Sequence, residues 1–166
     1  RELRLGWTQV HVAGASLAEL AMLQRMQSPL RCYVAVGGLG PAAERLLKDG
    51  AQRGARWAAR ALKLFIDGAL GSRGAALLEP YADAPESRGL LVNSSEKLLP
   101  LLIRALRAGL QIETHAIGDR GNRVMLDLYE KALAAVPRGE RRVAEPRWRI
   151  EHAQVLHPAD LPRFAR

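Results

Sequence analysis

The chain has 166 residues, 48% of them hydrophobic, and a formal net charge of +8. This length and composition are those of one globular domain and exclude a disordered or low-complexity chain. No apolar run approaches the roughly 18 residues of a membrane span, and the single cysteine, Cys32, has no partner for an internal disulfide. We therefore expect a soluble, cytoplasmic protein and, because the chain begins at Arg1 rather than Met, one cut from a longer sequence.

Five short runs have the length and composition of β-strands, and helical patterns separate them. The helical patterns begin at Ser16, Pro41, Ser94 and Asp119, of which Ser16 and Asp119 are the expected N-caps. The strand-like runs are GWTQVHVA (6–13), LRCYVAV (30–36), ALKLFID (61–67), GLQIETHA (109–116) and RWRIEHA (147–153).

Strands that alternate with helices indicate parallel strands joined by crossovers, so the predicted fold class is α/β. The spacing of the runs is close to the ~31 residues per unit expected when roughly 250 residues form the eight units of a TIM-type (β/α)8 barrel. Five units would leave the barrel unfinished, with two strand edges and an apolar inner face exposed. The Gly- and Pro-rich segment 68–93 is too long for an ordinary connection, and we expect it to shape a substrate site. Met22 and Met26, on a helix face, are expected in the core.

Active sites of parallel α/β folds lie where the strands end. His115 and His152 are at the ends of the fourth and fifth runs, and Lys63 and Asp67 lie in the third. Side-chain alternation puts Lys63 on one face with Phe65 and Asp67, His115 with Glu113, and His152 with Ile150. Another histidine, His11, is most simply a structural residue of the first run.

Neutral imidazoles are good zinc ligands, and two from adjacent strands supply half of a usual catalytic ligand set. An ammonium group cannot ligate a metal. Conversion of the Lys63 amine to a carbamate by carbon dioxide would turn it into a carboxylate on a long stem. Such a change would explain a lysine in an otherwise apolar strand, where an uncompensated ammonium is costly.

Three segments, LKLFIDGALGSRGAAL (62–77), ETHAIGDRGN (113–122) and RIEHAQ (149–154), resemble segments of the amidohydrolase superfamily, specifically its YtcJ-like branch, amidohydrolase family 3. GWTQVHVAG (6–14) is similar to the second barrel strand of that branch. The resemblance implies a distorted (β/α)8 barrel. Residues 1–166 would be a partial catalytic barrel, approximately strands two to six, with about five βα units.

The resemblance also implies a divalent metal, with zinc expected as one or two ions in the complete protein. Its ligands, and the catalytic residues, would be His115, His152 and a carboxylated Lys63. Asp67, Ser72 and Arg73 would face a small-molecule substrate, although Asp67 could equally cap its own glycine turn. The His-x-His pair of strand one and the aspartate of strand eight, both expected in the family, are not among the 166 residues.

The implied reaction is cleavage of a C–N bond of amide type through a metal-activated water. The isolated chain is expected to be inactive and to form a homo-oligomer. One alternative is a barrel that has lost its metal and its catalysis. Another is a basic module that binds nucleic acid or another polyanion through stretches such as RGERRVAEPRWR (138–149). Nucleic acid is the less favoured partner because the basic residues are scattered and lack an accompanying aromatic series.

Overall fold

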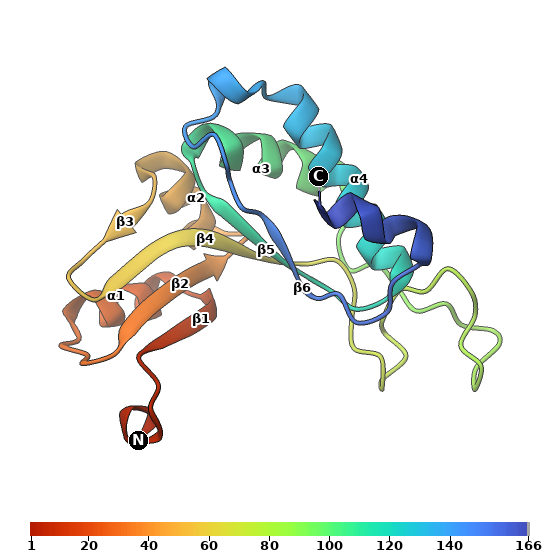
Figure 1. The fold of residues 1–166 in the computed structure, drawn as a ribbon, viewed down its shortest axis with the longest axis horizontal. Helices are drawn as coiled ribbons and strands as arrows, with labels where there is room; N and C mark the ends of the chain where they lie inside the picture. Colours follow the sequence, from red (N-terminus) through yellow and green to blue (C-terminus); the bar gives the residue numbers. More distant parts are fainter. Residues whose placement is uncertain (166) are drawn as a thin grey trace.

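The computed structural model describes residues 1–165, and its centre is a curved sheet that is parallel except for one short strand (Figure 1). The two-residue strand β3 (Gln52–Arg53) pairs antiparallel with β4 and was not predicted. The five parallel strands, in their order across the sheet, are β1 (Gln9–Ala15), β2 (Arg31–Gly37), β4 (Trp57–Phe65), β5 (Gln111–Ala116) and β6 (Arg149–His152).

Helices connect the parallel strands, which confirms the predicted α/β class and the partial barrel. None of the helices in residues 1–165 is both long and apolar enough to cross a membrane. The α-helices are α1 (Leu17–Arg25), α2 (Pro41–Asp49), α3 (Ser95–Ala108) and α4 (Asp119–Ala135), and the short 3-10 helices are η1 (Glu2–Leu5), η2 (Arg138–Glu140) and η3 (Pro158–Ala165).

The helix ends follow from local sequence. Ser16 caps α1 through a capping box with Glu19, as its position predicted. Gly109 ends α3 with a φ of 71°, a left-handed conformation that glycine adopts without strain. Asp119 is not an N-cap as predicted: the cap of α4 is Gly118, and the Asp119 carboxylate instead accepts a hydrogen bond of 2.9 Å from the Leu78 N–H in the long loop.

The helices cover one face of the sheet, and the apolar core lies between them. Burying one such aliphatic side chain contributes about 1.5–3 kcal/mol. Met22 and Met26 are not in this core as predicted, since they are 52% and 48% exposed and α1 buries only Leu20 and Leu23. The core includes Val34, Leu62, Leu64 and Ile112 from the strands and Leu46, Leu102, Leu106 and Met125 from the helices.

The other face of the sheet carries polar side chains, so the predicted apolar inner face is wrong. Cross-strand pairs on this face are His11 with Tyr33, Lys63 with Glu113, and Glu113 with Arg149. On β5 this face carries the polar residues Gln111, Glu113 and His115, whereas on β4 Lys63 lies between Ala61 and Phe65. We call this polar side the inner face of the sheet.

Candidate active site

The imidazoles of His115 and His152 lie against each other at the carboxyl ends of β5 and β6. Their ring centroids are 4.6 Å apart and their planes meet at 73°. The side chain of His115 is only 13% exposed, and this burial lowers its pKa. His115 is therefore neutral at physiological pH and keeps the nitrogen lone pair that a metal ligand needs.

His152 reaches this position through an unusual backbone. Its φ is 73° and that of Ala153 is 43°, both in the left-handed region that residues with a side chain rarely adopt. The turn breaks the side-chain alternation of β6: Ile150 packs against the apolar core on the helix side, whereas the ring of His152 contacts His115. The prediction that Ile150 and His152 share a face is therefore wrong. Such strain costs about 1–3 kcal/mol per residue and is found mostly at functional sites.

Lys63 lies on the same side of the sheet as His115 and is 7% exposed. Its Nζ donates to the carbonyl of Leu64 at 3.3 Å and lies 4.4 Å from the ring centroid of Phe65. That ring is in turn 5.3 Å from the ring of His115. Burial lowers the pKa of Lys63, which increases the share of neutral amine, the form that reacts with carbon dioxide.

A charged pair that the sequence reasoning missed lies beside Lys63 on the inner face. Glu113 is 2% exposed, and its Oε1 is 2.9 Å from a guanidinium nitrogen of Arg149. This contact is an ion pair without hydrogen-bond alignment, since Oε1 accepts no hydrogen bond. Burial raises the pKa of Glu113, while Arg149 opposes that rise. The sequence contained a signal, because Glu113 is two residues before His115 on one strand and therefore shares its face.

Asp67 lies behind the histidine pair and is 2% exposed. Its Oδ2 accepts hydrogen bonds from the N–H groups of Ala76 at 3.0 Å and Gly118 at 2.8 Å, and its Oδ1 accepts from Ile117 at 3.0 Å. None of these donors is in the glycine turn that the sequence suggested Asp67 might cap. The carboxylate instead joins the long loop to the turn between β5 and α4.

The segment 68–93 extends beyond the carboxyl end of β4 as a loop without a helix (yellow to green in Figure 1). Ser72 and Arg73 are exposed on it: the Ser72 hydroxyl donates to the Ala69 carbonyl at 3.2 Å, and Arg73 pairs with Asp83 at 3.0 Å. The hydrogen bond of Ser72 and the ion pair of Arg73 are both made within the loop and not with the histidine pair. Contact of these two side chains with a substrate stays a prediction.

The loop is attached to the HAIGDRGN motif by its backbone. The carbonyl of Ala76 accepts hydrogen bonds from the N–H groups of Arg120 at 3.1 Å and Gly121 at 3.2 Å. The glycines of the motif make this approach possible: a Cβ at Gly118 would lie 1.9 Å from the Ala76 oxygen, and one at Gly121 would lie 2.6 Å from Asp67 Oδ2. The motif therefore serves as a platform on which the loop docks.

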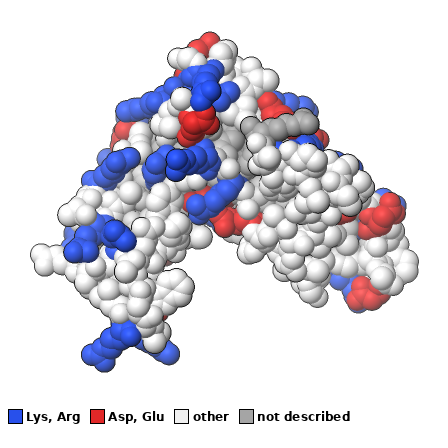
Figure 2. Space-filling model, in the orientation of Figure 1, with Lys and Arg blue, Asp and Glu red and all other residues white. Residues whose placement is uncertain are grey.

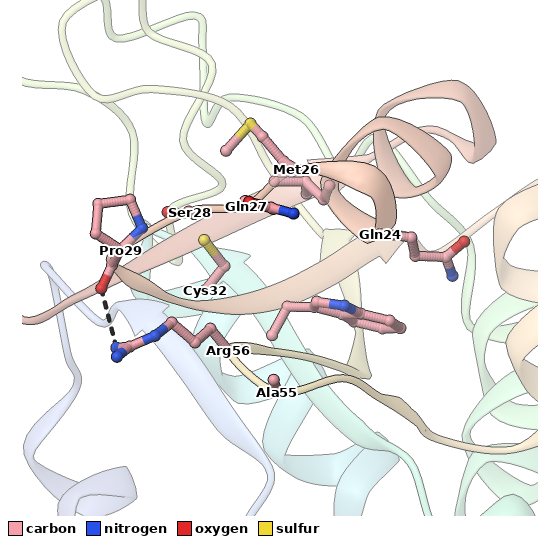
Figure 3. A pocket seen from close by; sticks show the side chains of 10 residues that line it. Gln24, Met26, Gln27, Ser28, Pro29, Cys32, Ala55 and Arg56 are labelled. Atoms are coloured by element: carbon pink, nitrogen blue, oxygen red, sulfur yellow. Dashed lines mark hydrogen bonds between the residues drawn. The ribbon is translucent and has the colours of Figure 1, made fainter.

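A pocket of about 390 Å³ lies away from this site, at the amino ends of β2 and β4 (Figure 3). Met26, Cys32 and Arg56 are among its lining residues, and Arg56 donates to the Pro29 carbonyl at 3.0 Å. Because Cys32 is near the start of β2 and His115 is near the end of β5, the pocket belongs to the opposite end of the parallel strands.

Charged side chains are distributed over the molecule. On the face drawn in Figure 2, basic side chains lie over several parts of the molecule with acidic side chains among them. In the segment 138–149, Arg138 pairs with Glu145, and Arg149 pairs with Glu113 and Glu151. In these ion pairs, glutamates neutralise arginines whose positive charge a polyanion-binding surface would need.

The donor chemistry of the site suits a divalent cation. Two imidazoles are in contact, and imidazole is a usual ligand of catalytic zinc. A buried lysine lies one aromatic ring away from them. No cluster of three or more His, Cys, Asp or Glu side chains in residues 1–165 is arranged to hold a metal ion. Within the described chain, the histidine pair is therefore the group of donors that best suits such an ion.

Comparison with known proteins gives concordant results. The sequence model of a protein family described as "Amidohydrolase family" matches residues 3–166. The chain is 47% identical over 103 residues to Protein LONG AFTER FAR-RED 3 of Arabidopsis thaliana, and 39% identical over 106 residues to the Bacillus subtilis (strain 168) protein named "Putative amidohydrolase YtcJ". These matches cover 62% and 64% of this chain and 17% and 18% of the relatives.

A solved structure is also similar. It is that of an uncharacterized metal-dependent hydrolase from Pyrococcus furiosus, with a TM-score of 0.76 and 31% sequence identity. The similarity covers 98% of this chain and 33% of that one. The chain therefore spans about a third of the solved relative and less than a fifth of the two curated relatives.

Proposed function

From the premise that this chain belongs to the amidohydrolase family, we propose that it forms part of a metal-dependent hydrolase that cleaves a C–N bond of amide type. The observation that carries the proposal is the contact between His115 and His152 at the ends of two adjacent parallel strands. That place is where the catalytic groups of barrel enzymes are found.

The residues proposed to hold the metal are His115, His152 and Lys63, the last as a carbamate. Burial supports two of these roles, since it keeps His115 neutral and lowers the pKa of Lys63. The chemistry that a divalent cation supplies when bound, with zinc as the proposed ion, is Lewis acidity toward a water molecule and a scissile carbonyl.

The remaining residues of the site hold and shape it. The left-handed backbone at His152 directs its imidazole toward His115 instead of toward the core. The ion pair of Glu113 with Arg149 compensates buried charge beside Lys63. The segment 68–93, with Ser72 and Arg73 exposed on it, is proposed to lie on the substrate side, where it would limit the size of the small molecule that enters.

The proposal is tested with the full-length protein that contains this sequence. We expect turnover of at least one member of a panel of small amides, loss of that turnover after treatment with a chelator, and recovery when zinc or another divalent ion is restored. His152→Ala is expected to reduce kcat/KM at least about a hundredfold, whereas His157→Ala, a histidine of the same segment outside the pair, is expected to leave it unchanged. A protein that binds divalent ions but hydrolyses none of the panel would support a barrel without this catalysis.

A further inference from the structure

We propose that Asp67 is a positioning residue that fixes the tautomer of His115 and couples this imidazole to the long loop. The Nε2 atom of His115 lies 3.3 Å from the carbonyl oxygen of Gly68 and 3.5 Å from Oδ1 of Asp67. Only the Gly68 carbonyl is in hydrogen-bond geometry, and the Asp67 carboxylate adds a negative charge facing the same nitrogen. An N–H at Nε2 satisfies both neighbours, so Nε2 is the nitrogen that carries the proton. The lone pair of the neutral ring is then on Nδ1.

The position of the Asp67 carboxylate is itself determined by its surroundings. Three backbone N–H groups, those of Ala76, Ile117 and Gly118, donate to its two oxygens at 2.8–3.0 Å. Gly121 lies so close that a Cβ there would be 2.6 Å from Oδ2. A buried side chain with these bonds and this packing has a single arrangement, and it can therefore hold the imidazole beside it in one orientation.

The same carboxylate links two parts of the molecule. Ala76 belongs to the segment 68–93, whereas Ile117 and Gly118 directly follow β5 and His115. Displacement of the loop at Ala76 would remove one of the three donors and disturb the acceptor that faces His115. The inference depends on the proposed function only in the use of the free Nδ1 as a metal ligand, because the tautomer is a property of the metal-free chain.

The tautomer can be measured by nuclear magnetic resonance of the full-length protein, labelled with nitrogen-15 in histidine and freed of metal by a chelator. We expect His115 to be in the Nε2–H form. Asp67→Asn removes the negative charge that faces Nε2 and is expected to shift the tautomer ratio by about tenfold toward Nδ1–H. The matched control is Asp83→Asn, an exposed aspartate of the same loop that pairs with Arg73, and it is expected to leave the ratio unchanged.

Two results would overturn this inference. One is a wild-type His115 in the Nδ1–H form, a result that needs no variant and so does not depend on whether Asp67→Asn folds. The other is a folded Asp67→Asn protein with the wild-type ratio. Failure of the proposed function is distinguishable, since a protein that binds no metal but shows the Nε2–H form at His115 would refute the metal site and leave the role of Asp67 intact.

Discussion

Gly118 illustrates how one residue determines whether two distant segments can meet. A Cβ at this position would lie 1.9 Å from the carbonyl oxygen of Ala76, far inside van der Waals contact. Its φ of −75° is allowed for any residue, so the requirement for glycine is one of space and not of backbone conformation. The glycine permits the hydrogen bonds that attach the segment 68–93 to the start of α4.

Gly118→Ala is expected to destabilise the chain because the added methyl group must displace the Ala76 backbone. Overpacking of this kind costs about 1–3 kcal/mol of unfolding free energy. Urea titration measures the change, with Gly139→Ala as the control. Nothing lies within 4 Å of a Cβ at Gly139, so the control is expected to change the unfolding free energy by less than about 0.5 kcal/mol. Equal stability of Gly118→Ala and wild type would show that the loop does not need this contact.

At the scale of single residues, the sequence predicted that His115 and His152 lie together, but it did not predict what surrounds them. His115 and His152 were located by their positions at the ends of apolar runs, and the structure brings their rings together. The partners of Asp67 could not be predicted, because Ala76 and Gly118 meet only through tertiary packing. The orientation of His152 could not be predicted either. Its left-handed φ breaks the side-chain alternation along the strand on which the prediction relied.

Among the elements, the strands and helices could be predicted from composition and capping residues, because parallel strands joined by helices have strong local signals. The antiparallel strand β3 could not be predicted, since two residues carry too little pattern.

The helix η3 is stabilised by ion pairs with α4. Arg163 on η3 donates hydrogen bonds to Asp127 and Glu130 of α4, and also to Asp160, which accepts a bond from Arg123 as well.

The attachment of η3 to α4 is expected to weaken at acid pH. Burial by itself would raise the pKa of Asp160, but the hydrogen bonds from Arg163 and Arg123 hold it below its usual value. Because the folded pKa is lower than the unfolded one, the ionised carboxylate stabilises the fold above the unfolded pKa of about 3.9. This stability is lost as the pH falls through the folded value.

Urea titrations between neutral and strongly acid pH measure this effect. Asp160→Asn is expected to be less stable than wild type at neutral pH, with the difference decreasing below about pH 4. A difference that is constant over the whole pH range would contradict the role assigned to the Asp160 carboxylate.

For the molecule as a whole, the main feature is a curved sheet with a polar inner face and two open edges. Within residues 1–165, β1 pairs only with β2 and β6 pairs only with β5. Exposed strand edges present unpaired N–H and C=O groups that pair readily with another chain. We therefore expect the 166-residue chain to self-associate, and light scattering should give a mass of about twice 18.2 kDa or more. A monomer at every concentration of a dilution series would contradict this expectation.

The most direct test of the central claim is the divalent metal content of the purified full-length protein, measured by mass spectrometry of its elements. We predict about one or two divalent ions per chain in wild type. The double variant His115→Asn with His152→Asn is predicted to lose most of that metal, whereas His157→Asn is predicted to retain it. A wild-type protein without divalent metal after reconstitution, or a double variant with the wild-type content, would contradict the assignment of His115 and His152 as metal ligands.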